Sequence, residues 1–139
     1  MRSPEQILRE TKTIAMVGAS PDPGRPSHGV MRYLLDQGFR VIPVRPPDVE
    51  EVLGVPVVAS LAEIDEPIDL VDVFRREGAA PAHAREAVEA GAKAFWLQLH
   101  LFSPEARRIV TEAGLDYVED ECTAIVHRRM ESANRGAQI

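Results

Sequence analysis

Short apolar runs alternate with amphipathic segments along the chain. Each apolar run is short enough to form a single strand. The five runs cover residues 13–17, 39–44, 70–74, 93–99 and 115–118. Between them, helical spacing and helix-start residues predict helices that begin near Ser3, Ser27, Ala82, Ser103 and Cys122. The pattern therefore predicts strands and helices in alternation.

The strand segments are nearly continuous in apolar residues. That pattern is typical of a parallel sheet whose two faces are both covered. Right-handed crossovers then favour an α/β fold, a Rossmann-like, doubly wound parallel sheet of five strands with helices on both faces. Numbered along the chain, the strands are expected in the order 3-2-1-4-5. We expect a single domain over residues 1–139, with its core at about 10–130 and a frayed end at 132–139.

Composition narrows the classes of partner. The 139 residues carry 16 basic and 22 acidic side chains, a net charge of −6, so a broad nucleic-acid surface is not expected. No apolar run reaches the roughly 18 residues of a membrane-spanning helix. The single cysteine, Cys122, suits a reducing compartment. We therefore expect a cytoplasmic protein that binds a small molecule, with a protein partner or a homo-oligomer left open.

The loop after the first strand holds the most informative residues, because ligands of doubly wound folds bind beyond the carboxyl ends of the strands. Gly18 permits a tight turn, and Arg25 offers bidentate contacts to a phosphate. The start of the next helix adds unpaired N–H groups. A loop of about ten residues is long for a plain connection capped by Ser27, which favours a function. Its predicted ligand-binding residues are Gly18, Ala19, Ser20, Arg25, Pro26, Ser27 and His28.

Three further strand ends are expected to converge on the same edge. After the second strand, NAD-binding domains place an acidic residue on the ribose hydroxyls, whereas this chain has Arg45. An arginine there favours a ribose phosphate, which NADP and coenzyme A (CoA) both carry, although an ordinary exposed arginine fits equally well. The missing G-x-G-x-x-G fingerprint weakens the case for NADP as the ligand. The predicted ligand-binding residues of these strand ends are Val44, Arg45, Pro46, Val73, Phe74, Arg75, Arg76 and Gln98.

Several short stretches carry a resemblance to a known family. They include Val17-Gly18-Ala19-Ser20, Arg25-Pro26-Ser27-His28, Val71-Asp72-Val73-Phe74-Arg75-Arg76 and Trp96-Leu97-Gln98. On these motifs the chain resembles the small stand-alone CoA-binding proteins, whose fold matches the CoA-binding domain of the succinyl-CoA synthetase α subunit. The resemblance implies a Rossmann-like domain that binds CoA or an acyl-CoA at the four strand ends. The chain departs from the family's usual pattern at Arg45, Leu99-His100 and Glu121.

No constellation in the sequence points to a catalyst. A nucleophile elbow and metal-ligand spacing are both missing, and a lone cysteine is most often a small buried apolar residue. We therefore expect a small non-catalytic module that binds CoA or acyl-CoA, with no catalytic or metal-binding residue. Two alternatives stay open: a CoA-linked transferase or ligase component that is active only with a partner subunit, and an NADP-dependent reductase.

Overall fold

Capping residues mark where several helices begin. Ser3 and Ser103 each accept a hydrogen bond from the backbone N–H three residues further on, and a proline follows each of them.

The computed structural model describes residues 1–137. The α-helices are α1 (Pro4–Arg9), α2 (Pro26–Asp36), α3 (Ala80–Glu89), α4 (Pro104–Glu112) and α5 (Thr123–Ala137), and the 3-10 helices are η1 (Leu61–Glu63) and η2 (Glu77–Ala79). The strands are β1 (Thr13–Val17), β2 (Arg40–Val44), β3 (Glu51–Val52), β4 (Val55–Pro56), β5 (Leu70–Val73), β6 (Ala94–Leu97) and β7 (Asp116–Val118).

Five of these strands form one parallel sheet in the order β2-β1-β5-β6-β7. The α/β class and the parallel five-stranded sheet are confirmed. The predicted strand order is wrong, because the third main strand, β5, pairs with β1 and does not lie beyond β2. The physical reason lies at the outer edge of β2, which is already occupied. Val58 donates a backbone hydrogen bond to Pro43 and accepts one from Arg45, both 3.0 Å long.

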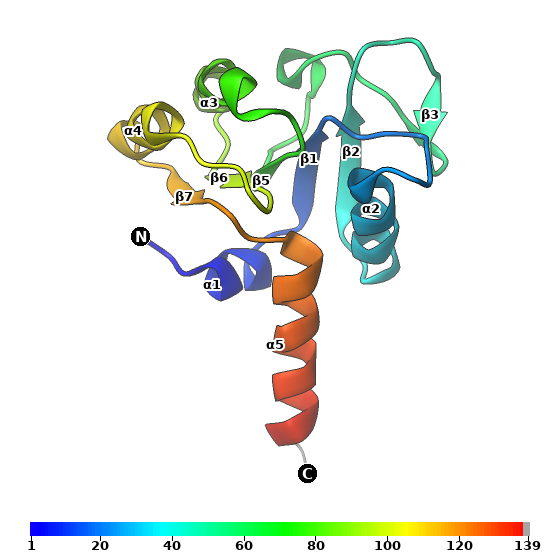
Figure 1. Ribbon diagram of the computed structural model, residues 1–139, viewed down its shortest axis with the longest axis vertical. Helices are drawn as coiled ribbons and strands as arrows, with labels where there is room; N and C mark the ends of the chain where they lie inside the picture. The colour runs from blue at the N-terminus through cyan, green and yellow to red at the C-terminus, as the bar shows by residue number, and fades with distance from the viewer. Residues whose placement is uncertain (138–139) are drawn as a thin grey trace.

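Helices cover both faces of the sheet (Figure 1). Alternate residues of each strand point to opposite faces. On one face, Ala15, Val71 and Phe95 belong to a buried cluster with residues of α3 and α4. On the other, Ile14 and Trp96 belong to a second buried cluster with residues of α1, α2 and α5. The sheet is therefore buried on both sides, as its continuous apolar strands predict.

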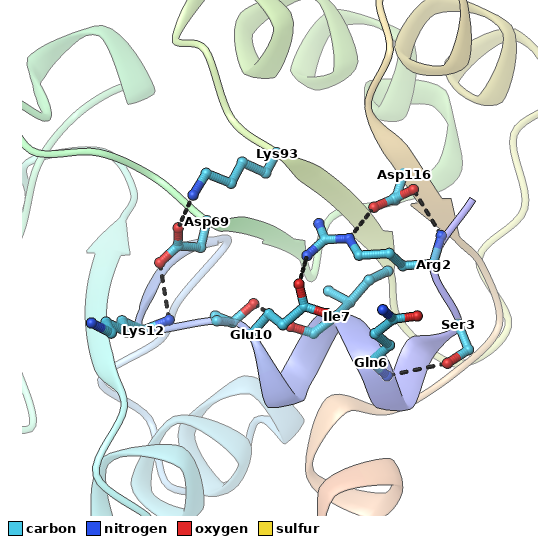
Figure 2. Close-up of polar contacts among 10 residues, drawn as sticks. Arg2, Ser3, Gln6, Ile7, Glu10, Lys12, Asp69, Lys93 and Asp116 are labelled. Carbon is cyan, nitrogen blue, oxygen red and sulfur yellow. Dashed lines mark hydrogen bonds and ion pairs between the residues drawn. The ribbon is translucent and has the colours of Figure 1, made fainter.

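Charged groups close the amino-terminal edge of the sheet (Figure 2). Asp116 accepts hydrogen bonds from the backbone N–H and the Nε of Arg2, at 3.1 and 2.6 Å. Asp69 accepts a 2.9 Å hydrogen bond from the backbone N–H of Lys12 and forms a 3.2 Å ion pair with Lys93. These contacts tie α1 and the strand starts together. The carboxyl ends of the strands lie at the opposite edge.

The last helix is longer than the sequence pattern predicts. Residues 132–137, which we expected to be frayed, belong to α5, and residues 138–139 lie outside the described residues. In Figure 1, α5 continues past the lower edge of the sheet. Ala133, Arg135 and Ala137 favour helix and offset Asn134 and Gly136, which do not.

Candidate functional site

A cavity of about 580 Å³ opens at the carboxyl ends of β1, β2 and β5. This first cavity brings together residues from three of the four predicted strand ends. It lies where the chain reverses direction across the sheet, between β1 and β5, which is the usual ligand position in doubly wound folds. Its lining residues are Gly18, Ala19, Ser20, Pro21, Asp22, Arg25, Pro26, Ser27, Arg45, Pro46, Phe74 and Arg75.

Gly18 begins the loop in a conformation that other residues rarely adopt. Its φ is +87°, and a Cβ atom added there would lie 2.9 Å from the carbonyl oxygen of Phe74. The backbone N–H of Gly18 also donates a 2.9 Å hydrogen bond to the carbonyl of Val44. The ends of β1, β2 and β5 are therefore in close contact at this residue.

The rest of the loop is held by its own side chains. Ser20 Oγ accepts a 3.1 Å hydrogen bond from the N–H of Asp22, and Asp22 Oδ1 accepts a 2.8 Å bond from the N–H of Gly24. Asp22, which sequence reasoning missed, places a carboxylate in the lining of the cavity. The sequence Ser-Pro-Asp-Pro-Gly at residues 20–24 predicts a turn stabilised by side-chain hydrogen bonds of this kind.

The first turn of α2 faces this cavity without a side-chain cap. The helix starts at Pro26, one residue before the predicted Ser27, and Arg25 stands at the N-cap position without making a capping hydrogen bond. Ser27 is buried and lines the cavity. An uncapped helix start presents free N–H groups and a partial positive charge. The arrangement suits an anionic group such as a phosphate.

Arg45 is engaged within the protein. Its Nη2 lies 2.9 and 3.0 Å from the two carboxylate oxygens of Asp48, and its Nη1 donates a 2.9 Å hydrogen bond to the carbonyl of Ala19. The hydrogen bond from Arg45 lowers the pKa of the exposed Asp48 carboxyl. Arg45 therefore clamps the loop after β2 to the loop after β1, and Asp48 balances its charge.

Arg25, Arg75 and Arg76 have no such partner. All three are exposed, and within residues 1–137 no carboxylate forms an ion pair with any of them. Arg25 and Arg75 line the first cavity, and Arg75 and Arg76 line its neighbour. These three residues therefore supply the positive charge of the site that no carboxylate of residues 1–137 balances.

A second cavity of about 410 Å³ adjoins the first, with which it shares Pro26, Phe74 and Arg75. Most of its wall is apolar. The other lining residues are Val30, Arg76, Gln98, Leu99, His100, Leu101 and Cys122. Its rim is tied across two loops, because the N–H of His100 donates a 2.8 Å hydrogen bond to Asp120 Oδ1. His100 and Asp120 both have positive φ, which is uncommon outside glycine.

A buried polar group lies behind the second cavity. Gln98 Nε2 donates hydrogen bonds to Asp72 Oδ1 at 2.5 Å and to Thr123 Oγ1 at 3.1 Å, and Thr123 donates a 3.0 Å bond to Asp72 Oδ2. Asp72 is fully buried. Burial raises its pKa to about 7, although the hydrogen bonds from Gln98 and Thr123 oppose the rise. Sequence reasoning did not predict Asp72 or Thr123 as residues of the site. The sequence does carry a signal for Asp72, which is a charged residue inside the apolar run 70–74.

The remaining predicted residues lie behind the cavities. Val44 and Val73 are buried strand ends, and His28 is buried in α2. None of the three lines either cavity. Cys122 is buried, as expected for a small apolar residue.

Two kinds of feature are missing from the described part of the chain. No group of three or more His, Cys, Asp or Glu residues among residues 1–137 is arranged to hold a metal ion. Within the same range, no helix combines the length and apolar character needed to span a membrane.

Comparison with known proteins adds to this geometry. A family model described as a CoA binding domain matches residues 12–128. The chain belongs to this family. YneT, an uncharacterized protein of Bacillus subtilis (strain 168), is 43% identical to this member of the CoA binding domain family over 123 residues, which are 88% of this chain and 90% of YneT.

Solved structures agree on the fold of this CoA binding domain. A hypothetical protein from Pyrococcus horikoshii OT3 is 38% identical, with a TM-score of 0.86 over 92% of each chain. The dinucleotide-forming acetyl-coenzyme A synthetase of Ca. Korarchaeum cryptofilum, in complex with phosphate and ADP, gives a TM-score of 0.72 at 22% identity. That match covers 84% of this chain and 27% of the synthetase chain, and it concerns the fold alone.

Proposed function

We propose that the chain binds coenzyme A or an acyl-CoA as a small non-catalytic module. The observation that carries this proposal is the join between the two cavities at Pro26, Phe74 and Arg75. CoA has the same division, since a phosphate-rich nucleotide is linked to a largely uncharged pantetheine arm. The phosphates would meet the start of α2 and Arg25, and the arm would pass Phe74 into the apolar cavity.

Membership of the CoA binding domain family supports this ligand over the other phosphate-bearing nucleotides. A cytoplasmic location goes with the proposal, because a free cysteine such as Cys122 suits a reducing compartment. The proposed contact residues are the sequence-predicted residues that line one or both cavities, namely Gly18, Ala19, Ser20, Arg25, Pro26, Ser27, Arg45, Pro46, Phe74, Arg75, Arg76 and Gln98.

Calorimetry on ligand-stripped protein tests the proposal. We expect saturable binding of one CoA per chain, with weaker binding of NADP and ATP. Mass spectrometry of freshly purified protein identifies the ligand that the chain retains. Absence of measurable CoA binding, or tighter binding of NADP, would overturn the ligand assignment. Turnover of an acyl-CoA by the isolated chain would overturn the non-catalytic part alone.

A second candidate function is a component of a larger CoA-linked transferase or ligase. It is favoured by the likeness in fold to the acetyl-coenzyme A synthetase, of which this chain matches 27%. The missing parts would then come from a partner subunit. Affinity purification from the native cell tests this candidate, which requires a larger subunit with a nucleotide-binding module to co-purify in stoichiometric amount.

A further inference from the structure

Three buried polar side chains meet behind the apolar second cavity. They come from separate elements, with Asp72 on β5, Gln98 directly after β6 and Thr123 at the start of α5. The hydrogen bonds among them form a closed ring. Both N–H groups of the Gln98 amide are used, one on Asp72 and one on Thr123. The Gln98 side chain is therefore held from two sides.

The hydroxyl of Thr123 decides which way the Gln98 amide faces. Thr123 has one hydroxyl hydrogen, which it donates to Asp72 Oδ2, so toward Gln98 its oxygen can only accept. The Gln98 atom that contacts both Thr123 Oγ1 and Asp72 Oδ1 must therefore be the NH₂ nitrogen. The carbonyl oxygen of Gln98, Oε1, then faces away from the fully buried Asp72.

No donor among residues 1–137 forms a hydrogen bond with Gln98 Oε1. Gln98 is only 5% exposed. In the same range, every side-chain oxygen or nitrogen that is cut off from solvent has a partner. Oε1 must therefore be accessible, and the accessible space beside Gln98 is the second cavity. An acceptor that is fixed and unpartnered in an apolar wall is the pattern of a ligand contact.

We infer that Gln98 Oε1 accepts a hydrogen bond from an amide N–H of an extended, largely apolar arm bound in the second cavity, and that Asp72 and Thr123 are positioning residues that keep Oε1 facing this arm. The inference rests on the proposed function, since the pantetheine arm of CoA combines secondary amides with an apolar chain. The apolar walls formed by Val30, Leu99 and Leu101 suit the rest of such an arm. A nucleotide without the arm has no reason to contact Gln98.

The test compares CoA with adenosine 3′,5′-bisphosphate, which carries phosphates but no arm. Gln98→Met removes the acceptor at nearly constant volume, and Thr123→Val removes the hydroxyl that orients it. Both variants should lower the affinity for CoA roughly three- to tenfold, which is the range of one hydrogen bond, and should change the affinity for the bisphosphate less than twofold. Thr123→Ser keeps a hydroxyl and should restore CoA binding. Gln6→Met, at an exposed position on α1, is the matched control.

The outcomes separate the inference from the proposed function. If the wild-type chain binds neither ligand, the proposed function fails. If it binds CoA and both variants leave CoA affinity unchanged, the inference is wrong. An equal loss for both ligands, or no recovery with Thr123→Ser, would mean that the ring only supports the fold. Should Thr123→Val fail to fold by circular dichroism, Gln98→Met and Gln98→Asn decide the question with the same two ligands.

Discussion

At the scale of single residues, Gly18 carries a tight steric constraint in the site. A Cβ atom there would lie 2.9 Å from the Phe74 carbonyl oxygen and 3.0 Å from Arg75 Cδ, at a φ of +87°. Gly18→Ala should therefore lower the free energy of unfolding by about 1–3 kcal/mol in urea titrations. Gly29→Ala is the control, because Gly29 is helical and its added Cβ would meet no atom within 4 Å. Gly29→Ala should stabilise by up to about 1 kcal/mol. If Gly18→Ala and Gly29→Ala changed the free energy of unfolding equally, the steric constraint at Gly18 would be contradicted.

Asp72 predicts a pH dependence of stability. Burial raises its pKa from 3.8 to about 7, so the folded state keeps a proton that the unfolded state releases between these values. The free energy of unfolding should then fall as pH rises through this window, by at most about 1.4 kcal/mol per pH unit. His127 acts in the opposite direction below pH 6.5, because burial lowers its pKa.

The difference between Asp72→Asn and wild type isolates the Asp72 contribution, since asparagine does not titrate and His127 is common to both. Urea unfolding from pH 4.5 to pH 8 should show the variant gaining stability relative to wild type as pH rises, with a plateau above about pH 7. Parallel curves for the two proteins would show that Asp72 is not the titrating group.

Single residues also show where sequence reasoning succeeds and where it stops. The turn at Gly18 could be predicted, because a glycine after an apolar strand has a local meaning. The role of Arg45 could not, because its contacts depend on the positions of the Asp48 side chain and the Ala19 carbonyl in space. The Asp72–Gln98–Thr123 ring joins residues up to 51 positions apart, and the sequence pattern does not show which of them meet.

At the scale of elements, the apolar runs identify strands but not their neighbours. All five main strands lie where the sequence predicts them, with ends that differ by a few residues. The order differs because pairing depends on which edge is free, and Val58 occupies the outer edge of β2. The start of α2 is one residue earlier than predicted, since Pro26 fits the first helical position without needing a cap.

The loops after β1 and β2 predict different roles for two arginines. Arg25 has no ion-pair partner among the described residues, whereas Arg45 is balanced by Asp48. Under the proposed function, Arg25→Ala should lower the affinity for CoA about tenfold, which is the range of one hydrogen bond to a charged group. Only one of the two substitutions, Arg25→Ala or Arg45→Ala, should lower the affinity for CoA more than it lowers the affinity for dephospho-CoA, which lacks the ribose phosphate. Calorimetry with both ligands makes the comparison. Negligible effects of both substitutions would place the phosphates elsewhere.

At the scale of the whole molecule, the two edges of the sheet differ in chemistry. Ion pairs such as Arg2–Asp116 and Asp69–Lys93 close the amino-terminal edge (Figure 2). The carboxyl edge instead carries two adjoining cavities. Their lining includes the side chains of Arg25, Arg75 and Arg76 and the Gln98 amide oxygen, none of which has a hydrogen-bonded or ion-pair partner among residues 1–137. The first cavity is built mainly from loops on the β1–β2 side, whereas the loops after β6 and β7 supply half of the residues that line the second. A ligand that fills both must therefore contact both halves of the sheet.

Hydrogen exchange can test this coupling across the molecule. Amides in a loop exchange more slowly when a ligand holds the loop closed. CoA should slow exchange in residues 18–27 and also in residues 98–101 and 120–122, which line the second cavity or tie its rim. Adenosine 3′,5′-bisphosphate, at a concentration giving the same occupancy, should slow exchange in residues 18–27 alone. Equal protection by the two ligands in every segment would mean that the arm does not enter the second cavity, because the nucleotide alone would then account for all the ordering.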